Sequence, residues 1–441
     1  MMNKSKKIWL FMFLAQSVCF AQQADIEPEV FVYKVKSGDT LQQISLKYLQ
    51  QPVDVAALKK LSRITNIDQI AVGTELRIPR HMLRYTPSNA TVMSIACASQ
   101  IRVNDKMLNN GDALREGAVI EVPPECNVTL LLEDSSSVRL PSGATLKITT
   151  LRKNLIESAP QVRLDLLRGR IELDVNKKKR SPTVPFEIHT PLSVMGVRGT
   201  EFRVGYSPED QTAQVEVLDG IVQTQGSASD EAKAITQGLG VPLDSDGKLL
   251  DIEKLLSPPI FLSAQNTTGA PPSFVVQLSP VQQANYYTAQ IANTANFSGQ
   301  TKHQNLLASE IFIDRLNKQA TFYQLTSVSN SGLVGTPKNY AFCMPSPDST
   351  VPRCAIVFDA PLASNSAISF SLSSLNEKPE TPTVDVANLK AKNGRFAIHG
   401  LPAGHYKWRL SYPSMINDTR QNKVTFVEQS GSFELIALVP N

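Results

Sequence analysis

One stretch of the chain combines residue types that carry out acid-base and anion-binding chemistry. It reads HTPLSVMGVRGTEF and runs from His189 to Phe202, with Gly196 and Gly199 on either side of Arg198. An imidazole can serve as a general base, and a guanidinium offers five hydrogen-bond donors in a fixed fork. Catalysis needs a general base or a nucleophile held near the arginine, and the only local candidate is His189, nine residues earlier at the end of an expected strand. We therefore favour a structural role for this stretch over a catalytic one. The chemistry that remains is hydrogen bonding by the arginine.

The two glycines of this stretch predict its shape. Glycine tolerates positive φ and close backbone approach, so two glycines three residues apart let the chain bend tightly between two alternating segments. We expect a turn in which Arg198 holds neighbouring carbonyl groups or a carboxylate such as Glu201 or Glu216. Recognition of a partner by the same loop is the alternative.

The rest of the sequence shows no constellation that indicates an enzyme. The five histidines are spread over positions 81, 189, 303, 399 and 405, and the common nucleophile, zinc-protease, phosphate-loop and dinucleotide motifs are missing. The paired carboxylates of a glycosidase stay open, because such acids come from distant sequence positions. We expect no catalytic residue, no metal ion and no cofactor.

The elements that must position the opening stretch are strands. Between residues 90 and 225, short alternating segments are separated by Gly, Asn, Asp and Pro, which is typical of an all-β domain. We expect strands at 128–132, 137–140, 144–149, 162–167, 170–175, 185–189, 201–205 and 212–218. The segments DLLRGRIELDV and EVLDGIVQTQ place Gly169 and Gly220 at equivalent points, which favours a roll, a sandwich or a short solenoid.

A smaller module with a different pattern precedes this region, at residues 31–80. YKVK alternates as a strand does, a Ser-Gly-Asp turn follows, and Thr40 to Gln43 fits the Thr-x-x-Gln capping box that begins a helix. Pro52 ends that helix, a second helical periodicity follows, and TELRIP alternates again. The pattern predicts a strand, two helices and a closing strand.

The segments YKVKSGDTLQQISLKY and NIDQIAVGTELRIP, with their spacing, resemble the LysM module over nearly all of residues 31–80. The resemblance implies binding of peptidoglycan or chitin, polymers that contain N-acetylglucosamine, in a shallow groove between two loops. Carried onto this chain, one wall of the groove is Gly38, Asp39, Thr40 and Leu41, and the other is Asn66, Ile67 and Ile70. Backbone amides at a glycine turn and a small apolar floor suit an uncharged acetamido sugar. The same residues can also have structural roles in the turn, the helix cap and the core, and these roles are compatible with sugar binding.

The opening stretch, followed by TAQVEVLDGIVQT, is similar to the signature of the FecR family, and NNGDALREGAVIEV with LLLEDSSSVRLPSGATLKI resembles the earlier half of that family. FecR domains are periplasmic β domains of regulators that relay the state of an outer-membrane transporter to a sigma factor. Those regulators begin with a cytoplasmic segment and one membrane span, unlike this chain. The resemblance implies mainly structural roles for the motif residues Gly196, Arg198, Gly199, Thr200 and Gly220.

The C-terminal half is expected to hold a linker and two further β domains. Residues 226–258 are poor in aromatics and rich in Gly, Asp, Ser and Lys, which indicates a linker or an extended strap. Residues 259–345 resemble a fibronectin type III-like domain, and residues 351–441 an immunoglobulin-like sandwich. In the latter, Tyr406 and Trp408 share one strand face, where core packing is favoured over a second saccharide site. The expected fold is multidomain and mostly β, with a small βααβ module, an all-β FecR-like domain at 90–225 and two sandwiches.

The first 21 residues are typical of a cleaved export signal. MMNKSKKIWLFMFLAQSVCFA carries three lysines, an apolar run shorter than a membrane span, and small residues before a cleavage site. Its removal takes away three lysines and no acid, so the formal charge falls from +4 to +1. A net charge of this size offers no positively charged surface for nucleic acid. Because of the export signal, we expect the protein in the periplasm of a Gram-negative bacterium.

Four cysteines remain after export, and an even number in an oxidising compartment favours disulfides. Three connectivities exist, and pairing within predicted domains favours Cys97 with Cys126 and Cys343 with Cys354. A metal site is the rival interpretation, but the sequence lacks Cys-x-x-Cys spacing.

Three functions in different classes follow from these patterns. The first is a non-enzymatic periplasmic protein that binds peptidoglycan through residues 31–80 and presents its β modules to a partner protein. The second is a sensor or regulator whose FecR-like region contacts a membrane receptor or signalling protein. The third is an unrecognised cell-wall hydrolase. Peptidoglycan is the expected ligand in the first, and nucleic acid is not expected in any of them.

Overall fold

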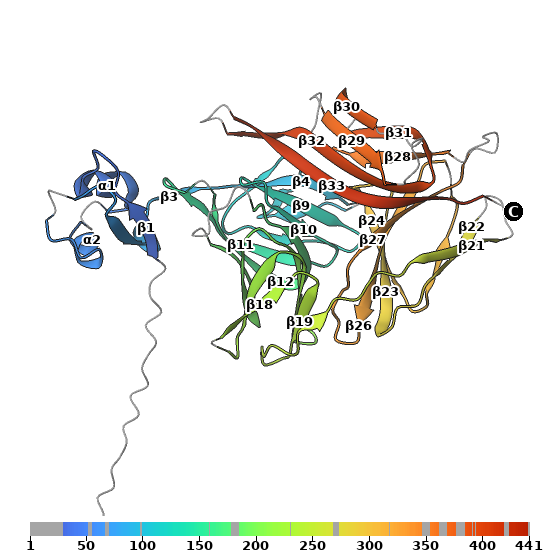
Figure 1. Ribbon diagram of the computed structural model, residues 1–441, viewed down its shortest axis with the longest axis horizontal. Coiled ribbons are helices and arrows are strands. Elements are labelled where there is room, and N and C mark those ends of the chain that lie inside the picture. Colours follow the sequence, from blue (N-terminus) through green and yellow to red (C-terminus); the bar gives the residue numbers. More distant parts are fainter. Residues whose placement is uncertain are drawn as a thin grey trace, which may run out of the picture. The chain divides into compact units, whose positions relative to one another are not determined.

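The structure is a computed structural model, and it describes residues 30–51, 55–66, 70–97, 99–157, 159–177, 185–229, 231–267, 273–316, 318–345, 353–360, 368–375, 384–389, 391–392, 394–418 and 423–439. The predicted export signal and Ile67 lie outside these residues. The chain divides into two compact units, Met1–Arg84 and Tyr85–Asn441, which are described separately (Figure 1).

The first unit has the predicted order of strand, helix, helix and strand. Its elements are β1 (Val30–Lys34), α1 (Leu41–Tyr48), α2 (Val55–Leu61) and β2 (Glu75–Pro79), followed by the 3₁₀ helix η2 (Arg80–Met82). β1 and β2 pair antiparallel. The core consists of fully buried apolar side chains from all four elements, among them Tyr33, Leu41, Ile44, Leu58 and Leu76. Periodicity therefore predicts this unit correctly.

The second unit begins with eighteen strands that form two sheets and one short hairpin. They are β3 (Tyr85–Pro87), β4 (Ala90–Ala96), β5 (Arg102–Val103), β6 (Lys106–Met107), β7 (Ala113–Leu114), β8 (Val119–Glu121), β9 (Asn127–Leu132), β10 (Ser137–Leu140), β11 (Thr145–Asn154), β12 (Gln161–Asp174), β13 (Phe186–Thr190), β14 (Ser193–Val197), β15 (Glu201–Ser207), β16 (Thr212–Asp219), β17 (Ile221–Gly226), β18 (Ala232–Thr236), β19 (Leu239–Leu243) and β20 (Glu253–Lys254).

Strand β12 belongs to both sheets. Its first half pairs with β11 and, in parallel, with β13, in a sheet that continues through β14 and β17 to β18; we call this sheet I. Its second half pairs with β10 and β15, in a sheet that runs from β7 through β4 and β9 to β16, β19 and β20; we call this sheet II. One continuous strand thus replaces the two expected at 162–167 and 170–175.

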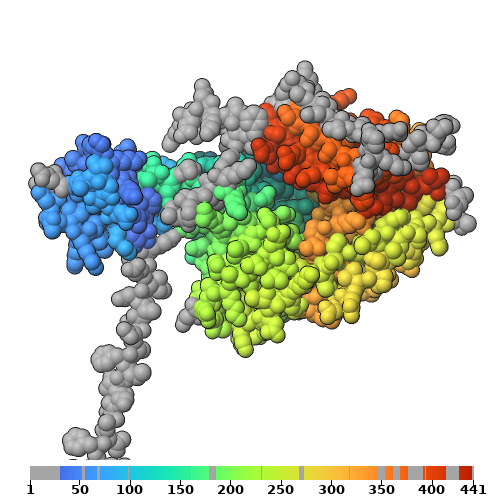
Figure 2. Space-filling view, viewed as in Figure 1, coloured from blue at the N-terminus to red at the C-terminus, as the bar shows by residue number. Residues whose placement is uncertain are grey.

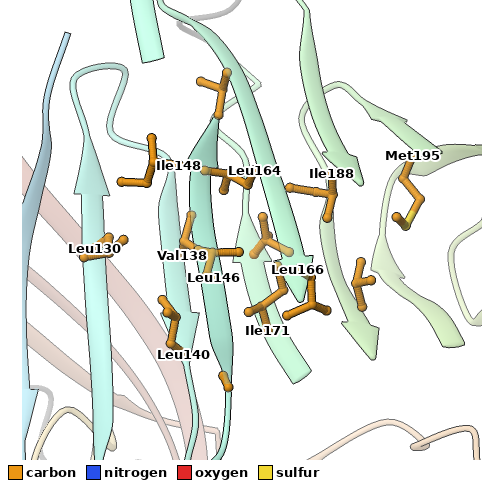
Figure 3. Close-up of a cluster of buried hydrophobic side chains, with 14 of the residues drawn as sticks. Leu130, Val138, Leu140, Leu146, Ile148, Leu164, Leu166, Ile171, Ile188 and Met195 are labelled. Atoms are coloured by element: carbon orange, nitrogen blue, oxygen red, sulfur yellow. The ribbon is translucent and has the colours of Figure 1, made fainter. Parts of the chain in front are cut away.

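The two sheets enclose one hydrophobic core. Figure 3 shows side chains from several strands of both sheets converging on it, including Leu130, Val138, Leu146, Leu164 and Met195. In β10 and β12 the buried residues alternate with more exposed ones, as the sequence pattern predicts, whereas every residue of β9 is buried. Burial of this apolar surface is the main term that favours folding of this part.

The glycines of the sequence echo lie where the chain passes from one sheet to the other. Gly169 is the point at which β12 leaves sheet I for sheet II, and Gly220 joins β16 of sheet II to β17 of sheet I. Their φ angles are +82° and +88°, a region that other residues rarely adopt. The internal repeat therefore reflects two equivalent sheet crossings.

Residues 226–258, predicted as a linker, are part of this fold instead. β18 pairs with β17 in sheet I, and β19 pairs with β16 in sheet II. Ile235, Val241 and Leu243 of these strands are buried in the common core. Composition misled the prediction because the polar residues of the segment occupy turns and outward strand positions, while a few apolar residues suffice to anchor it.

The C-terminal strands form an eight-stranded sheet with two smaller sheets packed on it. They are β21 (Phe261–Thr267), β22 (Ser273–Leu278), β23 (Ala284–Ala292), β24 (Thr301–Leu306), β25 (Glu310–Ile313), β26 (Thr321–Ser329), β27 (Lys338–Cys343), β28 (Arg353–Asp359), β29 (Ile368–Ser374), β30 (Val384–Leu389), β31 (Arg395–Pro402), β32 (Gly404–Asp418) and β33 (Lys423–Ala437). The order in the large sheet is β24-β23-β26-β27-β33-β32-β29-β30.

The two predicted sandwiches are therefore joined edge to edge. β27 pairs in parallel with β33, so one sheet continues across the expected boundary at 345–351. The disulfide between Cys343 of β27 and Cys354 of β28 spans the same boundary, and does not lie within one domain as expected. The other predicted disulfide, Cys97–Cys126, is also formed. Tyr406 and Trp408 are 0% and 5% exposed, so they are core residues and not a sugar platform.

Sheet II packs against the C-terminal strands, and Figure 2 shows the green and yellow parts of the surface adjoining. Met93 and Leu131 of sheet II join the C-terminal core. The guanidinium of Arg203, a residue only 4% exposed, donates to the carbonyl oxygens of Val334 and Gly335 at 3.2 Å. The side-chain amide of Asn127 donates to the carbonyl oxygen of Gly299 at 3.2 Å and to the hydroxyl oxygen of Thr301 at 3.0 Å. Within the described residues, the C-terminal strands therefore pack against sheet II and do not form a separate domain.

We predict that Gly220→Ala lowers the free energy of unfolding by about 3 kcal/mol. An added Cβ would lie 2.9 Å from the carbonyl oxygen of Gly199, in addition to the unfavourable φ. Gly238→Ala is the matched control, because Gly238 has a φ of +77° but no atom within 4 Å of the added Cβ. The control should cost about 1 kcal/mol in urea unfolding. Equal losses in the two variants would show that close approach at the crossing is unimportant.

Candidate functional site

The turn between β1 and α1 has a defined polar scaffold. Oδ2 of Asp39 accepts hydrogen bonds from the Tyr33 hydroxyl and the Lys36 backbone N–H, both at 2.8 Å. Oγ1 of Thr40 accepts from the Gln43 N–H at 3.2 Å and caps α1. Gly38 and Thr40 are exposed at the tip, and Gly38 has a φ of +85°. The predicted turn residues therefore present backbone groups on a preorganised loop.

The Asp39 carboxylate is held in its ionised form. The hydrogen bond from the Lys36 backbone lowers the pKa of Asp39, and the Tyr33 hydroxyl and the charges of Lys36 and Lys47 act in the same direction. Conversely, burial and the bond to Asp39 raise the pKa of Tyr33. Phenol and carboxylate thus keep their donor and acceptor roles across the physiological range of pH.

The second predicted wall lies in the connection between α2 and β2. Asn66 is exposed, Ile70 is half-buried, and Ile67 lies outside the described residues. Two backbone hydrogen bonds hold this connection against the first turn, from Val35 N–H to the Thr74 carbonyl at 2.9 Å and from Gly73 N–H to the Val35 carbonyl at 2.8 Å. The fold therefore fixes the bases of both loops relative to each other.

Leu41 differs from its predicted role. Its side chain is 0% exposed and belongs to the core, so it supports the turn from below and cannot line a groove. The first helical position is apolar here because α1 packs its inward face against the sheet. The predicted groove wall on this side is consequently left with the exposed or half-buried residues Gly38, Asp39 and Thr40.

A hollow of about 440 Å³ adjoins the same turn along the outer side of α1. It is lined by Asp39, Gln43, Ile44, Leu46, Lys47 and Tyr48. Leu46 is 51% exposed, and the Lys47 ammonium lies 5.0 Å from the centre of the Tyr48 ring. The sequence did not single out this surface, because Gln43, Leu46 and Lys47 look like ordinary outward positions of a helix.

The FecR-like motif occupies the crossing from β14 of sheet I to β15 of sheet II. Thr200 is 1% exposed, and its hydroxyl bonds the carbonyl oxygens of Ile221 at 3.0 Å and Arg198 at 3.2 Å. A Cβ at Gly199 would lie 2.5 Å from the side chain of Lys177, and Gly220 lies directly against the Gly199 carbonyl. These three motif residues hold two sheet crossings together.

Arg198 does not form the predicted clamp. Its side chain is exposed and makes no hydrogen bond or ion pair to any described residue. The expected acceptor Glu216 is fully buried and is instead bound by both of its oxygens to Nη1 of Arg170, at 2.5 and 2.6 Å. No signal in the sequence points to this pair, because Glu216 lies opposite Arg203 in the neighbouring strand while Arg170 lies one strand further away.

Gly196 and His189 also differ from expectation. Gly196 lies inside β14 opposite Glu187 and Gln223, with an ordinary φ and no atom within 4 Å of an added Cβ. Neither strain nor crowding therefore requires glycine at this position of the outward face of sheet I. Nε2 of His189 lies 2.8 Å from the carboxylate of the neighbouring Glu187. The candidate base of the motif is therefore already paired with a carboxylate.

A cavity of about 210 Å³ lies between sheet II and the C-terminal strands. Arg139 and Arg203 line it, but their guanidinium groups are engaged with Glu172 and with backbone carbonyls. Asp174 and Glu201 face each other across β12 and β15, and burial together with a nearby carboxylate raises the pKa of each. The cavity is thus a polar space at a structural junction.

Among the described residues, no group of three His, Cys, Asp or Glu side chains could hold a metal ion. In the same residues, no helix has both the length and the apolar character to cross a membrane.

Comparison with known families assigns two regions of the chain. Residues 33–79 match the model of the LysM domain, and residues 118–223 match the model named FecR protein. No curated protein matches the chain.

Similarity to solved structures is weak. A crystal structure of a candidate anti-sigma factor from Parabacteroides distasonis is 18% identical with a TM-score of 0.26, and the match covers 31% of this chain and 59% of that one. The chicken CNTN1 FN1-FN3 domains are 9% identical with a TM-score of 0.17, and the match covers 53% and 97%. TM-scores this low do not establish a common fold with either structure, so the assignment of the two domains rests on the family matches. The chain carries a LysM domain at residues 33–79, followed by a FecR domain at residues 118–223.

Proposed function

We propose that the protein is a non-enzymatic component of the bacterial cell envelope that binds peptidoglycan through its LysM domain. The observation that carries this proposal is the turn at Gly38, Asp39 and Thr40, which is exposed at Gly38 and Thr40 and is held rigid by Tyr33 and Lys36. The connection that carries Asn66 and Ile70 is bonded to Val35, just before this turn, through Gly73 and Thr74. An acetamido sugar offers an N–H, a carbonyl and a methyl group, which backbone groups and a small apolar side chain can bind without charge. Rigidity favours binding because little conformational entropy is lost.

We further propose that the FecR domain presents the outward face of sheet I to a protein partner, which places the molecule in envelope signalling. Sheet II is covered by the C-terminal strands through Met93, Leu131 and Arg203, whereas Glu187, Val194 and Gln223 of sheet I reach solvent. Gly196 lies among these residues with no structural need for glycine. A glycine inside a strand often marks close approach of another backbone. The periplasm is the compartment that suits both domains.

Catalysis is not part of this proposal. Both assigned domains are of binding or regulatory types, and the candidate base His189 is bonded to Glu187. Zymography on purified sacculi tests the hydrolase alternative, and release of soluble wall fragments would establish it.

The groove can be tested by sedimentation of the mature protein with sacculi. We expect Asn66→Ala combined with Ile70→Ala to weaken retention about tenfold, because one hydrogen-bonding group and one apolar contact are lost. Lys60→Ala serves as the control, since Lys60 is exposed on α2 and is not one of the predicted wall residues. Circular dichroism of both variants checks that each is folded at the temperature of the assay. Undiminished retention of the double variant would remove the groove from the proposal.

The pH dependence of the LysM domain should follow Asp39. Its pKa is lower in the folded state, so its stabilising contribution is complete above the unfolded-state value of about 4 and disappears as the pH falls through the folded-state value. We expect Asp39→Asn to lower the melting temperature of the domain at pH 7, and the difference from wild type to shrink below about pH 4. A difference that persists unchanged at pH 2 would contradict this role of the carboxylate.

The partner face can be tested by photo-crosslinking in intact cells. A crosslinking side chain in place of Gln223 is expected to capture an envelope protein, whereas the same group at Lys302, exposed on β24, should not. Gly196→Arg should abolish capture at Gln223 without lowering the melting temperature, because the strand has room for the side chain. Capture that survives Gly196→Arg would argue against contact at this face.

A further inference from the structure

The hollow along α1 is continuous with the proposed groove. Asp39 belongs to both, because it forms the turn at the tip of the groove and also lines the hollow. A polymer that lies over Gly38, Asp39 and Thr40 would therefore have its substituents next to the exposed side of the helix. The residues available to such a substituent are those of the helix side that points away from the core.

The exposed residues of the turn and of α1 form a row that is as long as a short extended peptide. Asp39, Gln43 and Lys47 are spaced four residues apart, so they follow one side of the helix and of the turn before it. At a rise of about 1.5 Å per residue the row spans about 12 Å. An extended peptide of three or four residues covers about 10 to 14 Å.

The charges of the hollow favour an anionic occupant. Lys36 and Lys47 both act on Asp39, the one carboxylate that lines the hollow. That carboxylate is already engaged by the Tyr33 hydroxyl and the Lys36 N–H. Lys47 contacts the Tyr48 ring and forms no ion pair with a described residue. A carboxylate from outside would thus meet the ammonium group of Lys47, while the one carboxylate of the lining is turned to Tyr33 and the Lys36 backbone.

The remaining lining residues suit a peptide better than a sugar. The Gln43 side chain has both a donor and an acceptor for a peptide group. Leu46 is 51% exposed, which leaves an apolar surface for small aliphatic side chains. The exposed aromatic platform typical of sugar stacking is not offered here, since Lys47 lies over Tyr48 and Tyr33 packs beside it at 5.6 Å.

We propose that this hollow binds the acidic peptide stem of peptidoglycan, so that the LysM domain recognises the peptide substituents as well as the glycan. The proposal rests on glycan binding by the groove. Gln43 bonds the backbone of the stem, Leu46 contacts its aliphatic side chains, and Lys47 binds one of its carboxylates. Chitin lacks all of these groups. Glycan strands without stems keep one lactyl carboxylate on each N-acetylmuramic acid but have no peptide groups and no aliphatic side chains for Gln43 and Leu46, so they bind through the groove.

The test compares two forms of the same wall with the full mature protein. Intact sacculi carry peptide stems, and sacculi digested with an amidase that removes the stems leave bare glycan strands. We expect the wild type to bind the intact form about fivefold more tightly, at low ionic strength. Lys47→Glu should lose this difference while binding bare glycan as the wild type does. Lys60→Glu makes the same change of charge on the exposed face of α2 and should retain the difference.

The outcomes separate this inference from the groove itself. If wild-type protein binds both forms equally, or if Lys47→Glu keeps the preference, the peptide site is refuted while the groove stands. If wild-type protein binds neither form, the groove and the peptide site fall together. If Lys60→Glu loses the preference to the same extent as Lys47→Glu, general charge attraction explains it and the assigned site is refuted. Unchanged melting temperatures of both variants ensure that folding does not account for the result.

Discussion

The sharing of strand β12 between two sheets is the constraint on which the second unit depends. A strand that pairs with β11 and β13 in one half and with β10 and β15 in the other must change direction without losing its hydrogen bonds. Gly169 permits this change through its positive φ, and a Cβ at this position would lie 2.8 Å from backbone atoms of residues 143 and 144. Because the core lies between the two sheets, each later strand must join either sheet I or sheet II. The FecR-like motif at Gly199, Thr200 and Gly220 serves the same requirement further along the chain.

The division into two sheets also separates the surfaces available for function. Sheet II contributes Met93, Leu131 and the buried Arg203 to its junction with the C-terminal strands, so its outer face is used inside the molecule. A guanidinium removed from water is costly unless its donors are satisfied. Here the carbonyl oxygens of Val334 and Gly335 accept from it, and the buried Glu216 next to it is neutralised by Arg170. This arrangement ties the C-terminal strands to sheet II, and it is the reason why we propose sheet I as the face for a partner.

Local sequence patterns predicted the parts of the structure that local interactions determine. Thr40 caps α1, the LysM core follows the helical and strand periodicities, and the two glycines of the internal echo lie at equivalent crossings. Pairings between distant segments were not predictable in the same way. Alternation shows which side of a strand is buried, but it does not show that β27 pairs with β33, about ninety residues later, or that β18 and β19 anchor a polar segment. The partner of Glu216 was missed for the same reason, because Arg170 precedes it by 46 residues.

The LysM domain uses separate sets of atoms for stability and for the proposed recognition. Leu41, Ile44 and Leu58 form its core, while Asp39 directs its carboxylate inward to Tyr33 and to the Lys36 backbone. The exposed backbone of Gly38 and the exposed side chains of Gln43 and Lys47 lie outside this core. Surface substitutions away from such structural contacts usually change stability by less than about 0.5 kcal/mol. Ligand preference can therefore change at these positions without loss of the domain, whereas a change at Asp39 would affect the shape of the turn and recognition together.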